Sequence, residues 1–272
     1  MPNYDRTFNF SAGPAGLPLP VLEQAQLEML NFRSCGASIL EISHRSATFS
    51  DVLDSARNGI RQLLGANDDF EVLFLQGGSR LQFSMVPINL LQSETDRGNY
   101  VVTGTWSDKA LQEAANCHAT DIIWSGQKNG YSDLPDQTDL QSLVTNDAAY
   151  VYYTSNETIQ GIQFQDDLSF ASVPTICDAS SDLLSRPIDI NKYGMIYACA
   201  QKNAGPAGVT IVVIRKDLLN PTINECPSYL NYRNHADANS MYNTPPTFAI
   251  YMVDLVCQWL LNDIGSLEKM NQ

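Results

Sequence analysis

Short apolar runs alternate with longer stretches of helical periodicity along most of the chain. Seven of these runs are rich in β-branched and aromatic residues and apolar on both faces, which is typical of strands covered by helices on two sides. We expect strands at 71–75, 99–104, 120–125, 148–154, 173–180, 195–201 and 209–216. We expect helices at 20–32, 50–65, 80–92, 107–116 and 247–264. This alternation predicts an α/β fold with a mostly parallel, seven-stranded sheet flanked by helices.

The last two expected strands have a different connection. Only the Gly- and Pro-containing segment NAGPAG (203–208) separates 195–201 from 209–216, and it is too short to hold a crossover helix. We therefore expect these two strands to form an antiparallel pair at one side of the sheet.

Composition and charge narrow the classes of partner. The chain has 272 residues and 44% hydrophobic content, and its 16 Lys and Arg against 30 Asp and Glu give a formal charge of −14. Such a surface repels phosphate backbones, so we expect no nucleic-acid partner, and an anionic ligand would need a local basic pocket. No apolar run reaches the roughly 20 residues of a membrane span, and no signal peptide is apparent. We expect a cytoplasmic protein without a membrane partner.

Cysteine and histidine spacing predicts no metal site. The six cysteines contain no C-x-x-C pair, and none of the three histidines stands at ligand spacing from them. In a cytoplasmic protein the cysteines are expected to be reduced thiols.

Two segments at strand ends are candidates for chemistry. The turn QGGSR (76–80) lies between an expected strand and an expected helix, where main-chain N–H groups favour a phosphate. Asp178 ends the run VPTICD, at the sheet edge where α/β proteins bind ligands. Taken alone, the first is also an ordinary glycine turn, and the second is also a helix-capping residue.

Two further residues complete a possible cofactor site. Lys202 ends the next expected strand, where it is either a solvated lysine or a desolvated amine able to form a Schiff base. Trp106 follows the strand at 99–104 and is either a core residue or a face for a flat ring. A strand-end Asp, a strand-end Lys, a phosphate turn and an aromatic ring are together what a pyridoxal-phosphate site requires.

Seven segments then carry a resemblance to a known family. They are NFSAGPAGLP (9–18), SHR (43–45), GGSRLQF (77–83), SNETIQG (155–161), CDASSDLLSRPID (177–189), YACAQKNAGPAGVTIVVIR (197–215) and MYNTPPTF (241–248). Their sequence and order resemble those of phosphoserine aminotransferases, which are class-V pyridoxal-phosphate-dependent aminotransferases. The resemblance implies the fold type I architecture, pyridoxal 5'-phosphate as cofactor and a homodimer with composite active sites.

The resemblance also implies roles for individual residues around the cofactor ring. Lys202 would carry the cofactor as an imine and move a proton during catalysis. Asp178 would pair with the ring nitrogen, Trp106 would stack on the ring, and Thr158 would hydrogen-bond its phenolic oxygen.

Other matched residues would bind the cofactor phosphate and the substrates. The phosphate would be held by Ser79, Arg80 and Gln201 of one subunit, together with Asn243 and Thr244 of the other. Arg45, with His44 beside it, would bind the distal anion of each substrate, because a guanidinium accepts both carboxylate and phosphate. The expected small-molecule partners are phosphoserine, glutamate and their oxo acids.

The implied reaction is the transfer of an amino group from glutamate to 3-phosphohydroxypyruvate in serine biosynthesis. A phosphorylated oxo acid of pyridoxine biosynthesis is a second possible substrate. We expect an N-terminal arm at 1–16, a large cofactor-binding domain at 17–258, and at 259–272 the start of a linker helix to a small C-terminal domain absent from this chain. Because the family takes its arginine for the substrate α-carboxylate from that domain, a non-catalytic pyridoxal-phosphate-binding dimer is the alternative function.

Overall fold

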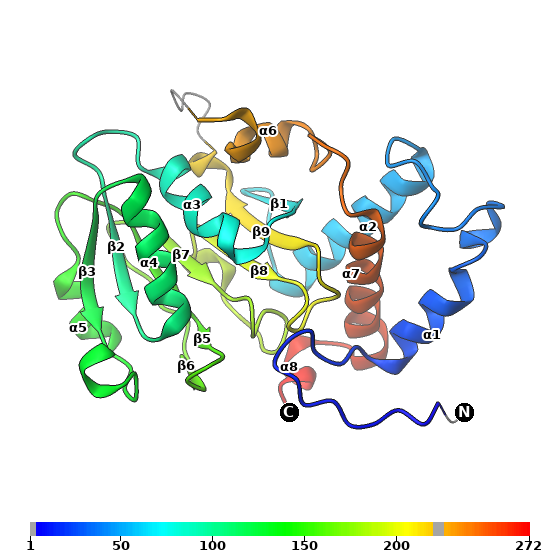
Figure 1. The fold of residues 1–272 in the computed structure, drawn as a ribbon, viewed down its shortest axis with the longest axis horizontal. Helices are drawn as coiled ribbons and strands as arrows, with labels where there is room; N and C mark the ends of the chain where they lie inside the picture. The colour runs from blue at the N-terminus through cyan, green and yellow to red at the C-terminus, as the bar shows by residue number, and fades with distance from the viewer. Residues whose placement is uncertain (1–3, 220–225) are drawn as a thin grey trace.

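The computed structural model describes residues 4–219 and 226–272 and consists of a central sheet with helices on both faces (Figure 1). The main sheet contains β1 (Phe70–Leu75), β2 (Arg97–Val102), β3 (Thr120–Ser125), β4 (Ala148–Thr154), β7 (Thr175–Asp178), β8 (Met195–Cys199) and β9 (Thr210–Arg215). A separate two-stranded ribbon is formed by β5 (Asn156–Glu157) and β6 (Ile162–Gln163). Each of the seven expected strands is present in the main sheet.

The strand order of the main sheet is β1-β9-β8-β7-β4-β2-β3. The four pairs from β8 to β3 are parallel, whereas β9 is antiparallel to both β8 and β1. The expected mostly parallel sheet with an antiparallel β8–β9 pair is therefore confirmed. Because β9 alone is reversed, the carboxyl ends of all other strands lie at one edge of the sheet.

Eight α-helices are found in the described part of the chain. They are α1 (Leu19–Glu28), α2 (Ala47–Leu64), α3 (Gly78–Leu90), α4 (Thr105–Cys117), α5 (Gln137–Leu143), α6 (Tyr232–Asp237), α7 (Thr247–Trp259) and α8 (Leu267–Met270). A π-helical turn, Leu260–Ile264, follows α7 and ends at Gly265, whose φ of 94° is left-handed. The helix expected at 247–264 is thus an α-helix with a widened last turn.

Side-chain alternation along the strands divides the core into two clusters. One cluster contains Val72 and Val213 and packs against α1, α2 and α7. The other contains Leu73 and Val212, the strand neighbours of those two residues, and packs against α3, α4 and α6. The strands are apolar on both faces because each face of the sheet has its own helical layer.

Buried tyrosines satisfy their hydroxyl groups in pairs. Tyr100 bonds Tyr150 and Tyr152 bonds Tyr197, each with 2.8 Å between hydroxyl oxygens. Each ring is almost completely buried, and burial raises the tyrosine pKa values well above the ordinary range in this cluster, as at Tyr197. The hydroxyl groups therefore stay neutral and remain able to bond each other.

One expected strand and one expected helix are shorter in the structure by three residues or more. The strand expected at 173–180 is limited to Thr175–Asp178, because Pro174 has no N–H for a ladder and turns follow Asp178. The helix expected at 20–32 ends at Glu28, and Arg33 and Ser34 adopt positive φ.

Within the described ranges, no helix is both long and apolar enough to cross a membrane. The first three residues of the expected N-terminal arm lie outside the described residues, and the domain boundaries remain predictions.

Candidate active site

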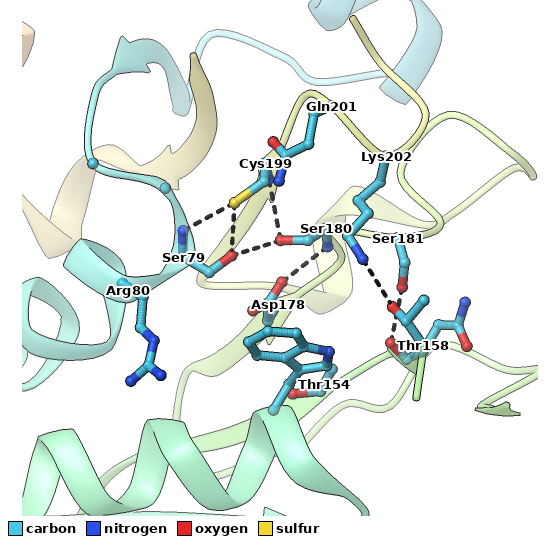
Figure 2. A pocket seen from close by; sticks show the side chains of 14 residues that line it. Ser79, Arg80, Thr154, Thr158, Asp178, Ser180, Ser181, Cys199, Gln201 and Lys202 are labelled. Atoms are coloured by element: carbon cyan, nitrogen blue, oxygen red, sulfur yellow. Dashed lines mark hydrogen bonds between the residues drawn. The ribbon is translucent and has the colours of Figure 1, made fainter. Parts of the chain in front are cut away.

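A cavity of about 210 Å³ lies at the edge where the strands end. Its lining comes from the start of α3 and from the segments that follow β2, β4, β7 and β8. The lining residues are Gly77, Gly78, Ser79, Arg80, Trp106, Thr154, Asn156, Thr158, Asp178, Ser180, Ser181, Cys199, Gln201 and Lys202. Figure 2 shows Ser79 and Arg80 on one side of the view, Lys202 and Thr158 on the other, and Asp178 between them. The structure thus brings together seven of the eleven residues expected to form the site.

The glycine turn at the start of α3 gives the cavity exposed main-chain donors. Gly77 and Gly78 have φ values of 90° and 64°, a conformation that residues with a side chain rarely adopt. After this turn, the N–H of Ser79 donates to the Sγ atom of Cys199 over 2.9 Å. Sulfur is a weak acceptor, so an oxyanion in the cavity would be a better partner for this helix N-terminus.

Asp178 ends β7 with its carboxylate buried. Its Oδ1 atom accepts a hydrogen bond of 2.9 Å from the main-chain N–H of Ser180. Burial raises the pKa of Asp178 to about 6, and the hydrogen bonds from Ser180 offset part of that effect. A buried carboxylate with a raised pKa is suited to pair with a cation in the cavity, because the cation would favour its charged form.

Lys202 extends across the cavity from the loop after β8. Its Nζ atom lies 3.4 Å from the Oγ1 atom of Thr158 and donates to it (Figure 2). The main chain of the N-terminal arm covers the lysine stem, because a Cβ atom at Gly13 would lie 2.7 Å from Lys202 Cδ. The same arm is fixed by the N–H of Ala15, which donates to the carbonyl of Gln201 over 2.9 Å.

Trp106 lies in the first turn of α4 and faces two lysines. The Nζ atom of Lys109 lies 4.9 Å from the Trp106 ring centroid, and Lys202 Nζ lies 6.0 Å from it. The indole is partly buried, packs against the second core cluster and also lines the cavity. A flat ring placed in the cavity could therefore stack on Trp106.

Four expected site residues do not line this cavity in the single chain. The Nδ2 atom of Asn243 donates to Oε1 of Gln76 over 2.7 Å, which places it beside the glycine turn. Thr244 and Arg45 are exposed and His44 is half-buried, and the cavity lining includes none of them.

Several lining residues were not expected from the sequence. The Oγ atom of Ser180 lies 2.8 Å from Ser79 Oγ and accepts from the N–H of Cys199, so it connects the glycine turn with the Asp178 segment. The buried Oγ1 of Thr154 has no hydrogen-bond partner among the described residues. The signal that could have identified these residues is their place at or just after the ends of β4, β7 and β8.

Comparison with known proteins shows the family of this chain. The family model described as "Aminotransferase class-V" matches residues 7–272. The chain belongs to the class-V aminotransferase family.

Curated relatives within the family share one name. The chain is 52% identical over 267 residues to phosphoserine aminotransferase of Rhodopirellula baltica, covering 98% of this chain and 70% of the relative. It is 49% identical over 265 residues to the protein of that name from Alkalihalobacillus alcalophilus, covering 97% of this chain and 72% of the relative.

Solved structures of family members match the fold closely. Phosphoserine aminotransferase from Bacillus circulans subsp. alkalophilus superimposes with a TM-score of 0.95 at 46% identity, over 98% of this chain and 73% of that chain. The pyridoxal-phosphate-bound enzyme from Trichomonas vaginalis gives a TM-score of 0.91 at 42% identity, over 98% of this chain and 78% of that chain. The resemblance and the fold expected from the sequence are both confirmed.

Proposed function

We propose that this chain is a phosphoserine aminotransferase that uses pyridoxal 5'-phosphate. It would transfer the amino group of glutamate to 3-phosphohydroxypyruvate and yield phosphoserine and 2-oxoglutarate. The observation that carries the proposal is one cavity that combines Lys202, buried Asp178 and the N-terminus of α3. Relatives at about half sequence identity bear the name of this enzyme.

The residues of the cavity fit this cofactor. When bound, pyridoxal phosphate supplies an electron sink and a carrier for the amino group. Asp178 would hold a proton on the ring nitrogen, which is the cation that its buried carboxylate requires. The main-chain donors after Gly77, together with Arg80 and Gln201, would hold the phosphate in a chain whose overall charge is −14.

Lys202 and its neighbours would carry the remaining contacts. Lys202 would bind the cofactor covalently through Nζ and move a proton at the substrate Cα. Thr158, already within hydrogen-bond distance of Nζ, would bind the phenolic oxygen, and Trp106 would stack on the ring.

Substrate recognition would involve a second subunit. Arg45 is exposed and His44 is half-buried, and neither lines the cavity of its own chain. We therefore assign them to the distal anion of a substrate bound by the partner subunit in a homodimer. Asn243 and Thr244 would reach the partner's cofactor phosphate in the same way. Because the proposed substrates belong to amino-acid biosynthesis, we place the enzyme in the cytoplasm.

The function is tested by spectroscopy and turnover on the same preparation. Pyridoxal phosphate should give a visible absorption band that borohydride abolishes, with the pyridoxyl group recovered on the Lys202 peptide. The preparation should form phosphoserine from 3-phosphohydroxypyruvate and glutamate. Cofactor binding without turnover would favour the non-catalytic dimer instead.

A second lysine provides the matched control. Lys202→Ala should lose the borohydride-stable adduct, because its Nζ is the amine that lines the cavity. Lys216→Ala should keep the adduct, because Lys216 is half-exposed and pairs with Glu71 over 3.3 Å. Recovery of the pyridoxyl group on Lys216 or Lys192 would refute the assignment of Lys202.

A further inference from the structure

Glu157 is completely buried and lies beside the cavity. The proposed reaction assigns no role to its carboxylate. It lies in β5, and its side chain enters the first turn of α4. Its Oε2 atom accepts from the main-chain N–H of Trp106 over 2.8 Å. Its Oε1 atom accepts from the N–H of Ser107 over 2.8 Å and from the Ser107 hydroxyl over 2.6 Å. The charge of Glu157 is therefore balanced by the positive end of a helix.

Helix α4 receives this cap from a segment about 50 residues later in the sequence, because its own N-cap is Gly104 and has no side chain. A Cβ atom at Gly104 would lie 2.6 Å from both Cγ and Cδ of Glu157, so the glycine is what admits the carboxylate. Gln160 adds a second contact, since its Oε1 accepts from the N–H of Thr105 over 3.2 Å. The start of α4 is thus attached to the 157–160 segment at successive N–H groups.

The same short segment also contributes a lining residue to the cavity. Thr158, next to Glu157, lies 3.4 Å from Lys202 Nζ, whereas Trp106 is one of the two residues whose N–H groups Glu157 binds. The Glu157 carboxylate therefore connects the first turn of α4, which holds Trp106, to the segment that holds Thr158.

We propose that Glu157 is a positioning residue that fixes Trp106 relative to Thr158 and so sets where the stacking indole lies with respect to the hydrogen bond to the phenolic oxygen. This inference rests on the proposed function, because it concerns a flat ring that both Trp106 and Thr158 would contact. Glu157 itself would not touch the cofactor, since it does not line the cavity.

The first test is Glu157→Gln, which keeps the shape of the side chain but removes its charge and replaces one acceptor with an amide donor. The amide would face either the Trp106 or the Ser107 donor, so the start of α4 should shift. We expect pyridoxal phosphate to bind about tenfold more weakly, because part of the stacking energy is lost when Trp106 is no longer held in position. The circular dichroism of the visible band should also fall, because it reports how the ring sits against Trp106.

Two comparisons separate positioning from general destabilisation. Asp136→Ala removes another capping carboxylate, the one that accepts from Thr138 at the start of α5, away from the cavity. It should lower thermal stability without changing cofactor affinity or circular dichroism. In a Trp106→Ala background, Glu157→Gln should add little further loss, because the indole that it positions is already gone.

The outcomes distinguish this inference from the proposed function. A wild-type chain that forms no visible band with pyridoxal phosphate would contradict the proposed function. A normal wild-type band with equal affinity and dichroism in Glu157→Gln would overturn the positioning role alone, as would fully additive losses with Trp106→Ala. If Glu157→Gln does not fold, Glu157→Asp provides the same comparison. Aspartate keeps the charge, but its side chain is one methylene shorter, so the carboxylate lies farther from the N–H groups of α4.

Discussion

At the scale of single residues, the fold changes the chemistry of Asp178 most clearly. The carboxylate is 3% exposed, and burial raises its pKa to about 6. Without a cation beside it, the charged form is unfavourable in the folded chain. The residue that we assign to the cofactor therefore costs stability when the cofactor is absent.

This cost gives a prediction about pH. Between about pH 4 and pH 6 the folded chain binds more protons at Asp178 than the unfolded chain does, so the stability of the cofactor-free protein should fall as pH rises. The difference between the pKa of Asp178 in the folded chain and in the unfolded chain corresponds to at most about 3 kcal/mol of stability at neutral pH. Asp178→Asn should therefore stabilise the cofactor-free protein at pH 8 and lose that advantage at pH 4. Urea unfolding at both pH values measures this, and equal effects at both would contradict it.

Arg45 should affect substrates rather than the cofactor. Because it lies outside the cavity of its own chain, Arg45→Ala should leave the visible band of the cofactor unchanged. It should weaken phosphoserine and glutamate together, by about 2–5 kcal/mol, and Arg45→Lys should restore only part of the loss. Titration of the visible band with each amino acid gives both affinities. Normal affinity for both substrates would refute the assignment and direct attention to Arg80.

At the scale of elements, the start of α3 depends on a glycine with positive φ. Gly77 has a φ of 90°, and a Cβ atom there would lie 2.6 Å from Cδ2 and 2.7 Å from Cβ of Leu81. Gly77→Ala should cost about 1–3 kcal/mol of stability and weaken the cofactor phosphate contact. Gly36→Ala is the matched control, because Gly36 has a φ of 85° and nothing within 4 Å of a new Cβ. Equal losses in denaturant titrations of the two variants would show that crowding against Leu81 has no effect.

The elements differ in how well the sequence predicts them. The expected ranges 120–125 and 148–154 coincide with β3 and β4, because strands buried on both faces form uninterrupted apolar runs. Helix α6 was not anticipated, since its six residues are too few to show helical periodicity. The cap of α4 was not predictable either, because its acceptor lies about 50 residues away and its own N-cap is a glycine.

At the scale of the whole molecule, strand topology explains why the site could be anticipated. Asp178 and Lys202 follow neighbouring parallel strands, β7 and β8, so their convergence at one edge follows from the predicted sheet. Asn243 and Arg45 come from outside the sheet, and their roles rest on the family resemblance.

The assignment of Asn243 to the partner subunit predicts complementation between variants. Chains carrying Asn243→Ala and chains carrying Lys202→Ala should each bind the cofactor poorly. If Asn243 serves the partner, co-refolding equal amounts should restore about a quarter of the tight sites, since each mixed dimer would hold one intact site. Borohydride trapping at limiting cofactor counts those sites. No recovery in mixed dimers verified by mass would mean that Asn243 acts within its own chain, beside Gln76.

The pairing of β1 with β9 also has a consequence for synthesis on the ribosome. Strand β1 ends at Leu75, and its neighbour begins at Thr210, 135 residues later, so β1 leaves the exit tunnel long before its partner exists. At about 5–20 residues per second, this wait lasts roughly 7–27 s. By contrast, β3 and β4 each pair with β2 and could do so much earlier. Until β9 has been synthesised, the apolar β1 segment has no partner strand in its own chain and is open to pairing with other chains.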